Sequence, residues 1–287
     1  MDKEELIQLK GAEEHYFGKR AVRIISLVSA ILLAVLFSVA FALDFEVKRA
    51  MFKNGSVLAD TVFYASLILP AVIFIITPIL VKKQSQAEGT FPKENEYISY
   101  YTLDNGFVKI LRICISLVIA VEGVVRAVAA ATANKGILSV AGMLLLSLCL
   151  ALYFVPEITE KLGAFKGRVH TVFGMVSLLW FLLNIIGTYT QRDFALSSDY
   201  FVLAEVGYVL AMLALTYEMR YHLDGGYLRT RLATSCAAFT FGFGLGFGRL
   251  VMLMACGQVS LEDTATAVTM LAVSLYFGAR IFFYEED

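Results

Sequence analysis

Residues that build catalytic and metal sites are scarce in this sequence. It has three histidines and four cysteines among 287 residues. The histidines show no His-x-x-x-His spacing and the cysteines no paired spacing, which the common zinc sites require. No glycine-rich phosphate loop follows a predicted strand either. These gaps argue against an enzyme, and we expect neither a metal ion nor a cofactor.

Charged residues are also few, at 17% of the chain against roughly 25% in an ordinary soluble domain. The formal net charge is −1, which gives no indication of a nucleic-acid partner. By contrast, 59% of the residues are hydrophobic, more than a soluble fold of this length could bury. The cysteines lie within apolar runs, so we expect free thiols that pack like small hydrophobic side chains: Cys114, Cys149, Cys236 and Cys256.

The apolar residues are gathered in eight runs of about 20 residues, the length that a ~30 Å hydrocarbon core requires at ~1.5 Å per residue. These runs are apolar on every face, whereas strands of a membrane barrel alternate over ~10 residues. The predicted fold is therefore all-α, a polytopic transmembrane helix bundle with the lipid bilayer as its surroundings. The spans are expected near residues 21–43, 57–81, 107–131, 137–155, 170–189, 200–217, 232–256 and 264–284.

The distribution of Lys and Arg outside these spans predicts the orientation of the chain. With the N-terminus inside, the inner segments carry 13 basic residues: Lys3, Lys10, Lys19, Arg20, Lys82, Lys83, Lys93, Lys161, Lys166, Arg168, Arg220, Arg229 and Arg231. The outer loops carry five: Lys48, Arg49, Lys53, Lys135 and Arg192. The positive-inside rule then favours a multi-pass protein of the cell membrane with both termini in the cytoplasm.

Four short sequence motifs, here called words, recur in the same order in the two halves of the chain, at offsets of 145, 120, 123 and 127 residues. The pairs are Val57-Leu58-Ala59-Asp60 with Val202-Leu203-Ala204-Glu205, residues 101–109 with 221–229, Gly123/Arg126 with Gly246/Arg249, and residues 143–148 with 270–275. The polar, linker-like loop 82–100 explains the one large jump, because the second half has no counterpart. Each word alone could recur by chance, so the collinear order carries the inference.

This order predicts a tandem repeat of four plus four spans. The expected organisation is an N-terminal segment over 1–20, a first repeat over 21–156, a cytoplasmic linker over 157–169 and a second repeat over 170–287. Because each unit has an even number of spans, the halves should be related by an axis along the membrane normal, as in several transporter folds.

Charges inside the predicted spans are the strongest indication of a site, because an ionised side chain at the centre of a span costs about 2.5–3.5 kcal/mol even on the lenient insertion scale. Arg126 and Arg249 lie well inside their spans, Asp60 and Glu205 lie near outer span ends, and Glu122 stands one turn from Arg126. Two interpretations stay open. The charges form ion pairs that hold the bundle together, or they form a polar site for an anionic or zwitterionic solute.

Two matching turns on the expected cytoplasmic side also carry charges of both signs. Asp104 and Asp224 precede a glycine and the next span, where a carboxylate can cap free N–H groups, and Lys109 and Arg229 follow. Over fewer than ten residues the turn resembles the cytoplasmic loop of major-facilitator transporters, although the number of spans differs. Arg280, near the inner end of the last span, is expected to extend to the headgroups.

The run Phe241-Gly242-Phe243-Gly244-Leu245-Gly246-Phe247-Gly248 contains two overlapping Gly-x-x-x-Gly patterns within a predicted span. Such patterns are typical of close helix packing in membranes. Glycine also weakens a helix by roughly 1 kcal/mol relative to alanine, so a hinge or an unwound segment is the alternative.

The leading functional hypothesis is a transporter or permease for a small, anionic or zwitterionic solute. The alternative is a membrane sensor or a membrane subunit of a larger complex that does not itself transport, with a membrane-protein partner or a second copy of the chain. A membrane enzyme acting on lipid is disfavoured by the scarcity of paired His, Cys or carboxylate residues.

Overall fold

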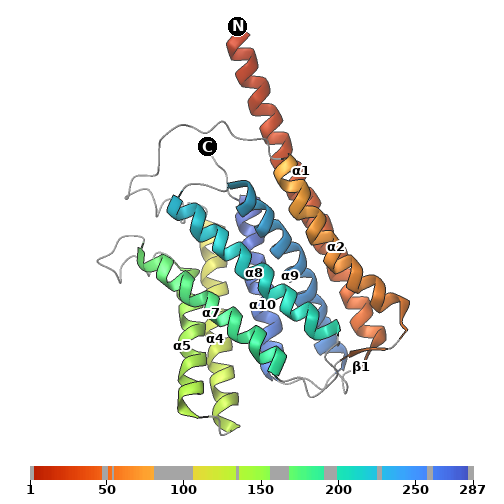
Figure 1. Ribbon diagram of the computed structural model, residues 1–287, viewed down its shortest axis with the longest axis vertical. Coiled ribbons are helices and arrows are strands. Elements are labelled where there is room, and N and C mark those ends of the chain that lie inside the picture. The colour runs from red at the N-terminus through yellow and green to blue at the C-terminus, as the bar shows by residue number, and fades with distance from the viewer. Residues whose placement is uncertain are drawn as a thin grey trace.

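The computed structural model describes residues 3–46, 51–53, 55–80, 106–133, 136–155, 168–190, 199–224, 228–256 and 261–283. Over these ranges the chain forms eight helices and one two-stranded hairpin (Figure 1). The helices are α1 (Lys3–Asp44), α2 (Val57–Leu80), α4 (Gly106–Thr132), α5 (Ile137–Tyr153), α7 (Arg168–Thr190), α8 (Asp199–Asp224), α9 (Leu228–Cys256) and α10 (Leu261–Phe283). The hairpin pairs β1 (Phe45–Glu46) with β2 (Met51–Phe52) in antiparallel register.

Seven of the described helices are long and apolar enough to cross a membrane. This confirms the expected all-α, multi-pass membrane fold. The remaining helix, α5, was expected as the fourth span over 137–155 and has 17 residues. At ~1.5 Å per residue it is about 26 Å long, somewhat less than the ~30 Å hydrocarbon core.

The two ends of the bundle can be told apart by their contacts. At the end that we name the terminal end, Arg23 Nε in α1 donates a hydrogen bond of 2.9 Å to the Ile281 carbonyl near the end of α10. The opposite end carries the β1–β2 hairpin, and we name it the hairpin end. The first part of α1 extends beyond the bundle at the terminal end (Figure 1).

Six helices form a closed ring in which each packs against the next. The order around the ring is α4, α5, α7, α8, α9 and α10, and α10 packs in turn against α4. α1 and α2 pack against α9 and against each other, on the side of the bundle opposite α4 and α5 (Figure 1). α9 is consequently the most deeply buried of the long helices.

The glycine run of α9 lets two neighbouring helices approach closely on different faces. A Cβ on Gly244 would lie 2.7 Å from Leu33 Cβ of α1, and one on Gly246 would lie 3.0 Å from the Leu271 backbone nitrogen of α10. Both distances are too short for an ordinary side chain. Since α9 is a continuous helix through these residues, close packing is confirmed and the unwound segment is not observed.

The helix packing does not show the four-plus-four repeat. The pairs α4–α5 and α9–α10 do share one feature, because Gly123 faces Ser147 and Gly242 faces Ser274, and the two serines occupy matching places in the repeated words. The pairs α1–α2 and α7–α8 also pack in both halves. The halves differ in the next contact, because α8 packs against α9 of its own half, whereas α2 packs against α9 of the other half.

Candidate functional site

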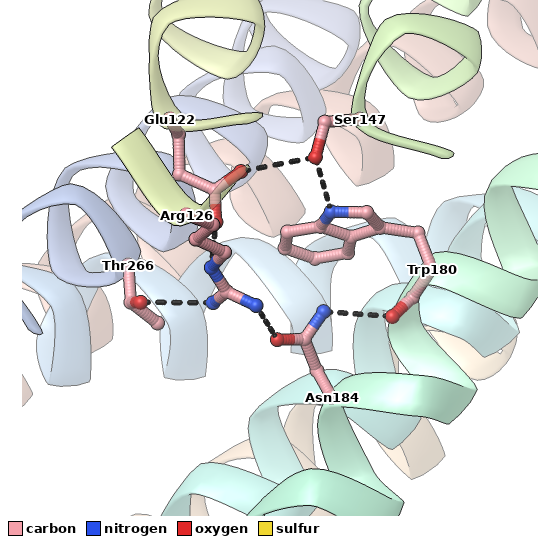
Figure 2. Close-up of polar contacts among 6 residues, drawn as sticks. All are labelled: Glu122, Arg126, Ser147, Trp180, Asn184 and Thr266. Atoms are coloured by element: carbon pink, nitrogen blue, oxygen red, sulfur yellow. Dashed lines mark hydrogen bonds and ion pairs between the residues drawn. The ribbon is translucent and has the colours of Figure 1, made fainter. Parts of the chain in front are cut away.

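A buried ion pair in α4 forms the centre of a polar network inside the ring (Figure 2). Glu122 and Arg126 stand one helical turn apart, and Arg126 Nε contacts Glu122 Oε1. The carboxylate side chain is 1% exposed and the guanidinium side chain 12%. The spacing follows from helix geometry, since residues four apart lie on the same face.

The guanidinium of Arg126 reaches two further helices. One terminal nitrogen donates to Asn184 Oδ1 of α7, and the other donates to Thr266 Oγ1 of α10 at 2.8 Å. The Asn184 amide is itself oriented by a 2.7 Å hydrogen bond to the Trp180 carbonyl. A single cation therefore links three helices of the ring.

Trp180, the only tryptophan of the chain, closes the network on the side of α5. Its indole nitrogen donates a 2.9 Å hydrogen bond to Ser147 Oγ, and that hydroxyl lies 3.3 Å from Glu122 Oε2. The Arg126 guanidinium carbon lies 5.4 Å from the indole ring centroid, within the range of a cation–π contact. Figure 2 shows the guanidinium surrounded by Glu122, Asn184, Thr266 and the indole ring.

The network therefore offers a fixed cation with a planar set of N–H donors in a place with little access to bulk water. A guanidinium of this kind suits a carboxylate or phosphate group, which it binds through two parallel hydrogen bonds. In the structure Glu122 is the anionic partner, through the contact between its Oε1 and Arg126 Nε. An anion could take its place, so the pair can act as an internal lock or as a binding site whose own carboxylate competes with the ligand.

The other charges expected at this depth are distributed over different parts of the bundle. Asp60 is exposed in the first turn of α2, on a helix that packs against α1 and α9 and not within the ring. Glu205 is half-buried in α8, and Arg249 is buried in the neighbouring α9. The ion pair at the centre of the polar network is Glu122 with Arg126.

The two expected cytoplasmic turns are described only in part. Asp104 lies outside the described residues, and Lys109 is exposed in the first turn of α4. Asp224 was expected to cap the helix that follows. Asp224 is the last residue of α8, while α9 begins at Leu228 and includes Arg229 in its first turn. The capping itself stays a prediction.

Sequence reasoning missed several members of the network. Ser147 and Thr266 carry no unusual signal for their position, because Ser and Thr are common at helix interfaces in membranes. Trp180 lies inside a span, whereas Trp is enriched at the membrane–water interfaces, so its position is a signal that the sequence analysis did not use. Asn184 has a stronger signal, since an amide in the middle of an apolar span needs a partner.

The sequence analysis was also wrong about the surroundings of two further residues, Glu218 and Arg280. The sixth span was expected to end at residue 217, whereas α8 continues to Asp224 and contains the buried Glu218. Arg280 was expected to extend to the headgroups, but it is 4% exposed and paired with Glu218. The extended helix brings a carboxylate to that guanidinium, which removes the need for headgroup contact.

Among the described residues, no group of three His, Cys, Asp or Glu side chains is placed to hold a metal ion. Comparison with known proteins gives no assignment, because no family model, curated protein or solved structure matches this chain significantly.

Proposed function

We propose that this chain is a transporter or permease for a small anionic or zwitterionic solute, and that Arg126 binds the anionic group of that solute. The observation that carries the proposal is the Glu122–Arg126 network, which α4, α5, α7 and α10 build in the interior of the ring. Charged groups inside a membrane bundle are costly to keep and commonly mark solute or ion pathways. The positive-inside rule would place the hairpin end outside the cell.

In this mechanism Arg126 exchanges one anionic partner for another. Glu122 neutralises the guanidinium when solute is absent, and the solute's carboxylate or phosphate replaces it when solute enters between the helices. Asn184 and Thr266 hold the guanidinium plane while this exchange takes place, since their bonds to Arg126 do not involve Glu122. The four-plus-four duplication would supply a pseudo-symmetry axis for alternating access, but the site does not require it.

Trp180 provides a direct assay for this proposal. It is the only indole in the chain, and the charge of Arg126 lies 5.4 Å from its ring centroid, so movement of the guanidinium should change its emission. We expect acetate, inorganic phosphate or glycine to cause a saturable change in the fluorescence of the purified protein. Glu122→Gln removes the competing carboxylate, so this variant should bind the same anion at least about tenfold more tightly, a change of ~1.4 kcal/mol.

Three variants test whether the response belongs to this site. Arg126→Met should abolish it, and the double variant Glu122→Gln with Arg126→Met, which strands no charge, should be folded and equally unresponsive. Lys109→Met, which changes an exposed cation in the same helix, should respond like the wild type. If no tested anion alters the emission of either the wild type or Glu122→Gln, or if the double variant still responds, the proposed site is wrong.

One observation favours the alternative of a membrane subunit or sensor that does not transport. Arg126 has a protein partner at each of its three nitrogens, as a purely structural cation would. On that reading Glu122→Gln destabilises the bundle without tightening the binding of any anion. The same titrations therefore separate the two functions.

A further inference from the structure

A second buried ion pair lies at the terminal end of the same ring. Glu218 Oε1 of α8 is 3.0 Å from Arg280 Nε of α10, and the two side chains are 2% and 4% exposed. The Tyr276 hydroxyl, also on α10, donates a 2.7 Å hydrogen bond to that same carboxylate oxygen. The guanidinium carbon of Arg280 lies 5.4 Å from the centroid of the Tyr276 ring.

The two oxygens of Glu218 differ sharply in their surroundings. Oε1 is engaged by both Tyr276 and Arg280, whereas the buried Oε2 has no hydrogen-bond partner among the described residues. A buried carboxylate oxygen without a donor is costly to keep. Uptake of a proton at Oε2 would remove the negative charge while Oε1 keeps its bond from the tyrosine hydroxyl.

Other helices of the ring contribute aromatic and basic groups to the same end. His170 of α7 stacks on Tyr153 of α5, with ring centroids 4.6 Å apart, and it lies within range of the charges of Arg112 and Arg280. Phe154, which directly follows α5, packs against the Tyr276 ring with ring centroids 4.6 Å apart. The second pair is therefore enclosed by the helices that also build the Glu122–Arg126 network.

We propose that Glu218 is a proton-binding site that couples proton movement to the transport of the anionic solute. A proton from the terminal side binds Oε2 and converts the carboxylate to a carboxylic acid. The formal charge of the Glu218–Arg280 pair then changes from zero to plus one, which strengthens the binding of the solute's anion at Arg126 inside the same ring. Release of the proton restores the ion pair and weakens that binding. The coupling to an anionic solute rests on the proposed function, whereas the proton-binding site at Glu218 does not.

Several other ionisable groups at this end could contribute to a pH response. β2, which packs against α8 at the hairpin end, brings no titratable side chain. The described ionisable side chains at the terminal end of α8, α7, α9, α10 and α4 are Tyr217, Arg220, His170, Arg231, Cys236, Tyr276, Arg280, Lys109 and Arg112. Asp224, the last residue of α8, also carries a carboxyl group. The carboxyl band of Glu218 is therefore assigned by its loss in Glu218→Gln.

The experiment is pH-difference infrared spectroscopy on the purified full-length protein in detergent, without added solute. The carbonyl stretch of a protonated carboxyl group is read on acidification. We expect a band that the wild type and Glu122→Gln both show and that Glu218→Gln lacks. Tyr276→Phe should shift the same band to higher frequency, because its carbonyl oxygen loses the tyrosine hydrogen bond. That variant leaves the ion pair intact, so the assignment does not depend on the folding of Glu218→Gln.

A second readout links the proton to the solute. The anion affinity read from Trp180 should rise at least about tenfold on acidification of the wild type and should not change with pH in Glu218→Gln. An infrared band unchanged in both Glu218→Gln and Tyr276→Phe would overturn the proton site. So would loss of the band on addition of sodium at constant pH, which would assign Oε2 to an alkali cation. If the band behaves as expected but no anion changes the Trp180 emission, the proton site stands and the proposed function fails.

Discussion

Replacement of Arg126 by Met should lower the free energy of unfolding by about 3–5 kcal/mol, the typical cost of removing one partner from a buried ion pair. The Glu122 side chain is 1% exposed, so its charge would remain in the bundle without the guanidinium that balances it. It would keep the contact with Ser147 Oγ at 3.3 Å. The links from α4 to Asn184 and Thr266 would be lost at the same time. Chemical or thermal unfolding in detergent measures the effect.

The double variant identifies the cause of that loss. Glu122→Gln combined with Arg126→Met removes both charges, and most of the stability should return because no ion is left buried. Lys109→Met, on the exposed side of the same helix, should stay within about 0.5 kcal/mol of the wild type. A double variant as unstable as Arg126→Met would show that the contacts to α7 and α10, and not the stranded carboxylate, account for the loss.

Replacement of Gly244 by Leu should separate α1 from α9 and cost about 1–3 kcal/mol or more, the range for overpacking a tight interface. The Cβ of the new side chain would start 2.7 Å from Leu33 Cβ and 3.3 Å from the Leu33 backbone carbon. A backbone cannot move aside as the end of a flexible side chain can, so the helices themselves must shift. The gain in helix propensity, roughly 1 kcal/mol over glycine, offsets only part of this.

Gly142 of α5 offers a matched control, because outside its own stretch of helix backbone no atom lies within 4 Å of the place where its Cβ would be. Gly142→Leu should therefore keep or raise the melting temperature, since it gains helix propensity without a collision. If Gly244→Leu and Gly142→Leu have the same melting temperature, close packing does not hold α1 on α9. That result would revive the alternative in which the glycine run serves as a hinge.

The Glu122–Arg126 pair could be found from the sequence, whereas its partners could not. Two opposite charges four residues apart in an apolar run must share a helix face, so local geometry alone brings them together. Asn184 and Thr266 lie 58 and 140 residues from Arg126 along the chain. Only the order of the helices around the ring decides that they meet it.

The same reasoning explains why Asp60 was grouped with Arg126 although the two lie in different parts of the bundle. Asp60 and Arg126 were grouped because both lie toward the same side of their spans, which depth along a helix can predict. Depth says nothing about the direction in which a residue faces or about which helices are neighbours. In the structure α2 packs outside the ring and Asp60 is exposed, so it contributes no contact to the network that the described residues form.

The sequence by itself determined that the chain is a multi-pass helical membrane protein. Run length and hydropathy are local properties that can be compared directly with the thickness of the bilayer. It also favoured close packing of the glycine run of α9 over a hinge, since a missing side chain allows a close approach wherever the partner lies. Only the tertiary structure decided that α1 and α10 are those partners, and that Glu218 of α8 neutralises Arg280 of α10. These pairings join residues far apart in the chain. In a bilayer the lipid is as apolar as the helix surfaces, so shape and polar contacts select the helix partners and hydrophobicity does not.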